Sequence, residues 1–290
     1  MKILIGTNLF GNYKRQEIAK DSWSHIKSVY SDKIDFRAIL FADEYNADDY
    51  PDKKIRECYT LTRSSKDIIP ESSKKLPVLK DILNKVYDVS STDSNITHIG
   101  YINSDCIVTP NLIEYLTSHP TDTIAVSRLD IQEVEDFAQI LAKGVKPSRM
   151  EIAGFDGFFI SIDWWKNHNH LINEYLIGQP YYDQVLAGII SVTGGKIYND
   201  ATKPILCHVQ HAIQWMDDTP EKRYNDTTLK NNPFDHLCFN MMHFHLQYNL
   251  LKRQPFGTFL KKDEKEQAFT DAFFDIMSLK TENHLKMIKP

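Results

Sequence analysis

The sequence predicts an α/β fold in which a mostly parallel, Rossmann-like sheet is flanked by helices and followed by a helical C-terminal tail. Strand and helix signals alternate through the N-terminal half, further short strands follow, and the chain beyond Pro220 is polar, aromatic and typical of helices. With 290 residues, 42% of them hydrophobic, the chain can fill the core of one large α/β domain or two small ones.

The N-terminal half supplies five strand candidates and two helix candidates. The second helix carries Leu76, Leu79, Leu83 and Val86 at helical spacing, so it should pack on the sheet. The strands are expected at 1–7, 35–42, 58–62, 97–105 and 123–129, and the helices at 16–29 and 77–87.

The second half is expected to begin with a short amphipathic helix over 132–144, closed by a glycine and followed by a loop at 146–150. A strand at 154–163 then leads into a helix that Asp163 is positioned to cap. A buried helix over 180–195, stopped by a glycine pair, precedes two more short strands at 196–200 and 204–211.

Composition narrows the partners and the compartment. The formal net charge of −5 argues against a nucleic-acid binder, although a local basic pocket for a phosphate ester is compatible with it. The four cysteines are widely spaced, which favours a reducing, cytoplasmic compartment. The sequence contains no run of about 18 apolar residues, the length that a transmembrane helix needs. The mixed apolar and basic segment 250–262 suits either a weak, peripheral membrane-surface contact or ordinary packing.

Asp105 is a candidate ligand for a divalent cation. The apolar run from Thr97 ends at Asp105, and the carboxyl ends of parallel strands are where such sheets bind ligands. A carboxylate there can hold a divalent cation over a bound phosphate. The alternative is that Asp105 only begins a turn before Thr109.

Other polar residues follow the first three expected strands and should face the same crevice, where they could contact a base, a ribose or a phosphate of a nucleotide. These are Thr7 and Asn8 with the loop ending at Arg15, then Asp43, then Arg63.

The order of several motifs resembles the glycosyltransferases of the GT-A fold. Asn103, Ser104 and Asp105 stand at the D-x-D motif of that family, and 155–163 is similar to a strand of its glycogenin-like and lipopolysaccharide-galactosyltransferase-like retaining members. Asp183, Gln184 and Leu186 are similar to the DQ-x-x-L helix of those enzymes. Their late histidine followed by a tryptophan is matched at His208, His211 and Trp215.

The resemblance implies a transferase that moves a sugar from a nucleotide-diphosphate donor to a hydroxyl of a glycan or glycolipid acceptor. It also implies Mn²⁺ or Mg²⁺ held by Asp105 with His208 or His211; spacing of three on a strand lets only one histidine reach the cation. Asn103 departs from the family's aspartate and removes one negative charge from the site. The resemblance further implies a catalytic domain over 1–215, with a nucleotide-binding half (1–109) and an acceptor half (110–215), and a helical extension over 216–290.

Three residues are expected to act on the reacting centre: Asp156, Asp183 and Gln184. An acid here could deprotonate the acceptor hydroxyl, whereas in a retaining enzyme Asp183 or Gln184 could lie beneath the oxocarbenium-like centre, and the sequence leaves both outcomes open. Asp183 is expected to begin a helix whose positive end lowers its pKa and keeps it ionised.

Three other functions stand as alternatives. A sugar-nucleotide nucleotidyltransferase would need a G-x-G-x-R loop after the first strand, which 6–15 does not provide. A histidine-based metallohydrolase would need ligand spacing such as H-E-x-x-H, which the sequence lacks. A non-catalytic nucleotide or glycan-binding module would be favoured if Asp105 and Asp183 lay far apart.

Overall fold

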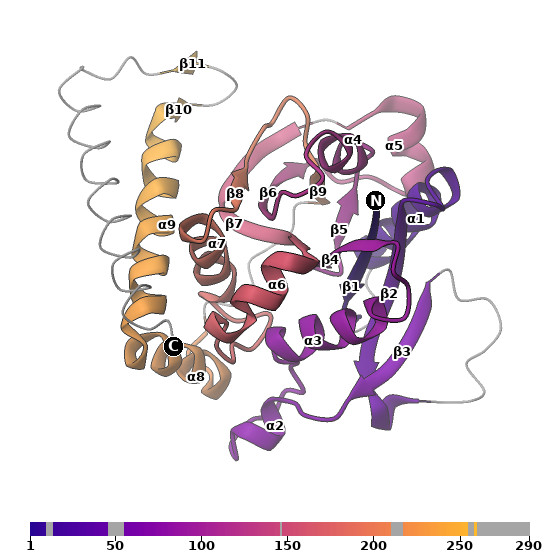
Figure 1. Ribbon diagram of the computed structural model, residues 1–290. Coiled ribbons are helices and arrows are strands. Elements are labelled where there is room, and N and C mark those ends of the chain that lie inside the picture. The colour runs from indigo at the N-terminus through magenta and orange to yellow at the C-terminus, as the bar shows by residue number, and fades with distance from the viewer. Residues whose placement is uncertain (10–13, 46–54, 146, 210–216, 255–257, 260–290) are drawn as a thin grey trace.

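A computed structural model describes residues 1–9, 14–45, 55–145, 147–209, 217–254 and 258–259 (Figure 1). Its main sheet has nine strands: β1 (Lys2–Thr7), β2 (Ile34–Phe41), β3 (Arg56–Leu61), β4 (Ile96–Ile102), β5 (Cys106–Val108), β6 (Ile124–Ile131), β7 (Pro147–Ser161), β8 (Lys196–Tyr198) and β9 (Leu206–Val209). The described helices include α1 (Lys14–Val29), α2 (Ser65–Ile68), α3 (Leu79–Ser90), α4 (Asn111–Ser118), α5 (Phe137–Lys143), α6 (Ile162–His168), α7 (Tyr182–Val192), α8 (Pro220–Asn231) and α9 (Pro233–Lys252). Short 3₁₀ helices lie at Ala42–Glu44 and Asn169–Leu171, and β10 (Arg253–Gln254) pairs with β11 (Thr258–Phe259).

The sheet is mixed but mostly parallel. Its order is β3-β2-β1-β4-β7-β6-β9-β5, with β8 also paired to β6. Strands β3, β2, β1 and β4 run parallel to one another, and β6 runs parallel to β8 and β9. Strand β7 lies between β4 and β6 and is antiparallel to both. The predicted α/β class is therefore confirmed, and β7 joins two parallel groups of strands.

Helices cover both faces of the sheet (Figure 1). On one face, α3, α6, α7 and α9 share a core built around buried residues such as Leu83, Phe158 and Ile189. On the other, α1 and α4 pack through Trp23 and Leu112. The apolar side chains of each helix recur at helical spacing and face the sheet. Burying them against the strands stabilises the sheet, at whose strand ends the polar residues lie.

The structure departs from the sequence-based expectations at two local positions. The segment 146–150 was expected to be a loop, but β7 already begins at Pro147. The expectation that Asp163 caps the next helix is wrong: Ser161 is the N-cap, its hydroxyl accepts from the Trp164 N–H at 3.2 Å, and Asp163 is exposed in the first turn. Serine suits this position because its short side chain turns back onto the first free N–H groups.

The described C-terminal helices pack against the α/β part. Thr219 caps α8, and α9 lies alongside α7 (Figure 1), where Cys238 and Met241 join the core of the sheet. The division at residue 215 stays a prediction. Among the described residues no helix is long and apolar enough to cross a membrane, and the side chains of 250–262 lie outside the described part.

Gly188 lets α9 approach α7 closely. A Cβ built on Gly188 would lie 2.6 Å from the Cys238 Cβ and 2.7 Å from its carbonyl oxygen. Since a backbone atom cannot rotate away, Gly188→Ala should force the helices apart and cost about 1–3 kcal/mol of the free energy of unfolding. Urea unfolding measures the change. Unchanged or increased stability, as helix propensity alone would give, would contradict close packing of α7 against α9.

Candidate active site

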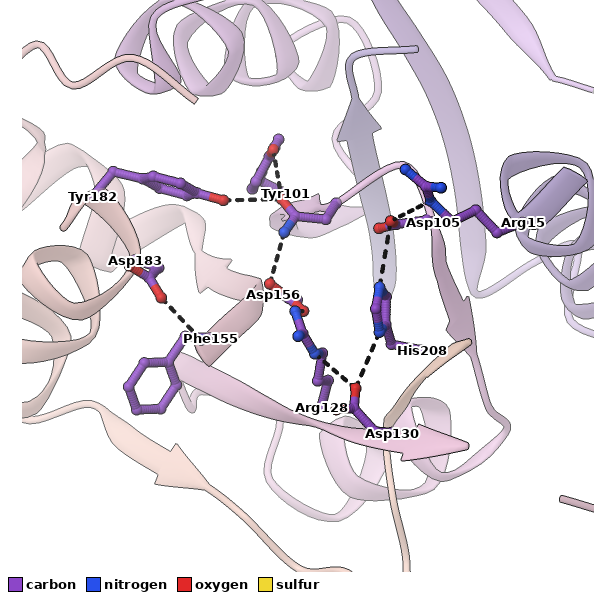
Figure 2. Close-up of polar contacts among 11 residues, drawn as sticks. Arg15, Tyr101, Asp105, Arg128, Asp130, Phe155, Asp156, Tyr182, Asp183 and His208 are labelled. Atoms are coloured by element: carbon purple, nitrogen blue, oxygen red, sulfur yellow. Dashed lines mark hydrogen bonds and ion pairs between the residues drawn. The ribbon is translucent and has the colours of Figure 1, made fainter. Parts of the chain in front are cut away.

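The polar ends of several strands meet because of strand register. Ile102 of β4 pairs with Gly157 of β7, and one residue further the Asn103 N–H donates to the Asp156 carbonyl at 2.9 Å. His208 of β9 is the register partner of Asp130 on β6 and of Cys106 on β5. Strand pairing thus assembles the turn 103–105, Asp156, Asp130 and His208 at one edge of the sheet (Figure 2).

His208 lies between two aspartates. Its Nε2 is 3.4 Å from Asp105 Oδ2, and its Nδ1 is 3.0 Å from Asp130 Oδ1. Burial alone would lower the pKa of His208, but the hydrogen bonds to Asp105 and Asp130 raise it to about 9. Arg15, from the first turn of α1, lies on the other side of Asp105, with Nε 3.1 Å from Oδ2. The imidazole therefore carries a positive charge between its two carboxylates.

Arg128 joins the two halves of the site. Its Nε donates to Asp130 Oδ1 at 2.9 Å, and its Nη1 donates to Asp156 Oδ2 at 2.5 Å. Burial would lower the pKa of this guanidinium, but the charges of Asp156 and Asp130 raise it further above its usual range. The same pairing, with His208, lowers the pKa of Asp130 despite the burial that would raise it. A continuous series of contacts runs from Arg15 through Asp105, His208, Asp130 and Arg128 to Asp156 (Figure 2).

Asp183 stands next to the end of this series. It lies in the first turn of α7, half-buried, and one of its oxygens accepts from the Phe155 N–H at 3.3 Å. Burial, and then the negative charge of Asp156, raise the pKa of Asp183 to about 6. The expectation that the helix end lowers this pKa is wrong, because desolvation outweighs the dipole. Gln184 follows Asp183 in the same turn.

A pocket of about 410 Å³ lies at the ends of β1 and β2. Leu40, Phe41 and Tyr59 give it apolar and aromatic walls, while Glu44, Glu57 and Lys75 supply charges. The pocket is joined to Asp105 through α1: Gln16 lines the pocket and its Nε2 donates to Ser104 Oγ at 2.8 Å, and the neighbouring Arg15 bonds to Asp105. The aromatic and polar lining suits a flat group with polar edges.

The residues expected to bind a nucleotide divide into two sets. Asn8 lines the pocket, with its Nδ2 bonded to the Ile39 carbonyl at 2.8 Å, and Thr7 is buried beside it. Asp43 is exposed and pairs with Lys75 at 2.6 Å. Arg63 is not among the lining residues of the pocket; its guanidinium pairs with Asp81 and Glu174.

The donor set fits a divalent cation in part. Asp105 Oδ2 and His208 Nε2 converge, an oxygen and an imidazole nitrogen suit Mn²⁺, and Asp130 orients the other ring nitrogen as outer carboxylates do at metal sites. Over the described part of the chain, no group of three or more His, Cys, Asp or Glu side chains could hold a metal ion, so further ligands would come from a bound diphosphate. His211 and Trp215 lie outside the described residues.

Several residues of the site escaped the sequence analysis. Arg128 and Asp130 stand two apart on an otherwise apolar strand and so share one face, which was an available signal for a buried polar site. Tyr101 and Tyr182, which bond to Asn103, sit in apolar runs and gave no such signal. Lys75, which the sequence analysis did not assign to the site, also lines the pocket.

No family model matches the sequence, and no curated protein matches it. Among solved structures, the chain is similar to S. aureus TarS 1–349, with 10% identity over 97% of this chain and 81% of that one and a TM-score of 0.45. It is similar to a glycosyltransferase involved in the glycosylation of the major capsid of PBCV-1, with 10% identity, coverage of 79% of this chain and 100% of that one, and a TM-score of 0.36. A third is the mannosyltransferase PcManGT from Pyrobaculum calidifontis in complex with GDP-Man and Mn²⁺, with 10% identity, coverage of 97% of this chain and 72% of that one, and a TM-score of 0.40. At these TM-scores the similarities carry no argument about the activity of this chain.

Removing Arg128 should destabilise the protein more than removing an exposed arginine. Arg128→Met leaves the carboxylates of Asp130 and Asp156, which are 2% and 6% exposed, without their shared cation, and should cost about 3 kcal/mol of the free energy of unfolding. Arg223→Met removes an ion pair whose side chains are 56% and 75% exposed, and should cost about 0.5 kcal/mol or less. Urea unfolding near neutral pH compares them, and equal losses would show that Arg128 does not balance the buried carboxylates.

Proposed function

We propose that this chain is a glycosyltransferase that moves a sugar from a nucleotide-diphosphate donor to a hydroxyl of a glycan or glycolipid acceptor, with the help of Mn²⁺ or Mg²⁺. One observation carries the proposal: a continuous polar site links Asp105, beside a nucleotide-sized pocket, to Asp156 and Asp183. The alternative is a non-catalytic nucleotide or glycan-binding module, which would be favoured if one donor could not reach both Asp105 and Asp183.

The pocket and the turn 103–105 would bind different parts of the donor. The base and ribose would occupy the 410 Å³ pocket, whose walls include Phe41, Tyr59 and Asn8. The diphosphate would then lie over Asp105, with Arg15 close enough to bond a phosphate oxygen. Asp105 and His208 would hold the cation, which supplies charge stabilisation to the leaving diphosphate when it is bound. Metal binding would displace the proton from His208 Nε2.

Asp183 and Asp156 supply the carboxylates at the sugar. In transfer, the bond between the anomeric carbon and the phosphate oxygen breaks, a bond to the acceptor oxygen forms, and the acceptor hydroxyl loses its proton. With a pKa of about 6, Asp183 is basic enough to take that proton and is mostly deprotonated near neutral pH. If the product instead retains configuration, Asp183 or Gln184 would stabilise the oxocarbenium-like centre.

Asp105→Ala should abolish the cation-dependent part of donor binding and leave the fold intact, since Asp105 lies in the half-buried turn 103–105 and not in the apolar core. Calorimetry of the parent and the variant against a panel of nucleoside diphosphates, with and without Mn²⁺, measures this. We expect Mn²⁺ to strengthen binding to the parent at least about tenfold and to leave the variant unaffected. Equal diphosphate affinity in the presence of Mn²⁺ would remove Asp105 from the metal site.

Asp183→Asn should lower turnover by about a hundredfold or more while nucleotide affinity stays nearly unchanged, because the amide cannot accept the proton. The parent's turnover should rise with pH through about 6, since a base acts in its deprotonated form and its pKa lies there. The residual rate of the variant should lack this rise. Gln184→Ala should do less damage unless the amide supports a retaining transition state. A variant at Asp183 that works at the parent rate would leave this residue as part of the helix end only.

A further inference from the structure

Asn103 stands where the resembled family has an aspartate, and its half-buried side chain makes three hydrogen bonds to other side chains of the protein. Its Oδ1 accepts from the Tyr101 hydroxyl at 2.9 Å and from the Tyr182 hydroxyl at 3.1 Å. Its Nδ2 donates to Asp156 Oδ1 at 2.6 Å, and its backbone N–H donates to the Asp156 carbonyl at 2.9 Å. The side chain therefore meets two donors on one side and a carboxylate on the other.

These contacts fix the orientation of the amide. Burial raises the pKa of both tyrosines well above the usual value, so their hydroxyls remain protonated and can donate. A carboxylate oxygen can only accept, so the NH₂ group must face Asp156 and the carbonyl oxygen must face the tyrosines. An ionised aspartate at position 103 could accept from both tyrosines but could offer Asp156 no proton donor.

The contacts also fix Asp156. Its Oδ1 accepts from Asn103 and its Oδ2 accepts from Arg128, and the residue is 4% exposed. The two donors come from different segments, Asn103 from the turn after β4 and Arg128 from strand β6. A carboxylate held at both oxygens keeps one direction relative to Asp183, whose environment it shapes by charge.

We propose that Asn103 is a positioning residue for Asp156, and that the amide stands in place of the family's aspartate because this task requires a donor. The inference rests on the proposed function, since Asp156 is taken as part of the transfer site. It assigns the contact with the donor diphosphate to Asp105 alone within the turn 103–105.

Asn103→Asp is the decisive variant, because it restores the family's motif while removing the donor to Asp156. Positioning predicts that turnover falls by about a hundredfold while the Mn²⁺-dependent affinity for a nucleoside diphosphate changes by less than about threefold. A direct role at the nucleotide or the cation predicts the opposite: affinity would change and turnover would follow it. A role in folding alone would move neither constant in the folded protein.

The chain offers a matched control in a second amide–carboxylate pair. Asn173 Nδ2 donates to the buried Asp235 Oδ2 at 2.9 Å, and the Tyr175 hydroxyl donates to the same oxygen at 2.8 Å. Asn173→Asp places two carboxylates together as Asn103→Asp does, but outside the transfer site. It should lower stability and leave turnover within about twofold of the parent.

Tyr182→Phe covers the case in which Asn103→Asp does not fold. It keeps the ring in the core and removes one donor to Asn103 Oδ1, so turnover should fall by about three- to tenfold with affinity unchanged. Turnover and nucleotide affinity of the parent and all three variants are measured on folded protein, with one nucleotide sugar and its diphosphate. Parent-like turnover of Asn103→Asp, or of Tyr182→Phe if the first variant does not fold, overturns the inference, as does a loss of affinity that accounts for the loss of turnover. A parent that neither binds nucleotide nor transfers sugar overturns the proposed function first, and the inference with it.

Discussion

The antiparallel strand β7 is the constraint on which the candidate site depends. It pairs with β4 on one side and β6 on the other, and so brings the end of the nucleotide-side strands against the strands that carry Arg128, Asp130 and His208. The pairing continues past the last regular residue of β4 as the bond from the Asn103 N–H to the Asp156 carbonyl. A one-residue shift of register would turn every side chain of β7 to the other face and separate these groups.

Charge balance is the second requirement of this arrangement. Buried carboxylates repel one another and lose their hydration, and both effects destabilise the folded protein. Contacts with cations and hydrogen-bond donors must offset this cost. Arg15, His208 and Arg128 alternate with Asp105, Asp130 and Asp156 along the series, so that each of these carboxylates meets a cation. Asp183 lies next to the series. Burial, and then the charge of Asp156, raise its pKa to about 6, although the Phe155 N–H that donates to it opposes this shift. A carboxyl group with this pKa is the one in the site that suits proton transfer near neutral pH.

The sequence predicted the elements better than the contacts among their side chains. Apolar periodicity located α1, α3 and the strands of the nucleotide side, because packing on a sheet demands it. It missed the first part of β7, where the pattern through Pro147 and Ser148 resembles a loop. It also placed the helix cap at Asp163, although a serine two residues earlier could serve equally well. Caps depend on local geometry that composition alone does not fix.

Only part of the candidate site could be predicted from the sequence. Asp105 stood out because it follows an apolar strand, and His208 was one of two histidines that the family resemblance implied. The structure brings the two side chains within 3.4 Å of each other. The environments of Asp183 and Asn103 depend on partners distant in sequence, 28 residues for Phe155 and 53 for Asp156. Desolvation of Asp183 by such distant groups outweighs the helix dipole, and no local pattern reports it.

In the proposed sugar transfer, the bond that breaks lies between the sugar and the diphosphate of the donor. Phosphorus NMR of the protein incubated with Mn²⁺, a mixed glycan acceptor and a panel of nucleotide sugars identifies the phosphorus product directly. If the chain is a glycosyltransferase, we expect at least one donor to be consumed to give the nucleoside diphosphate, with no sugar phosphate formed. Formation of a nucleoside monophosphate and a sugar phosphate, or consumption of no donor in the panel, would contradict it.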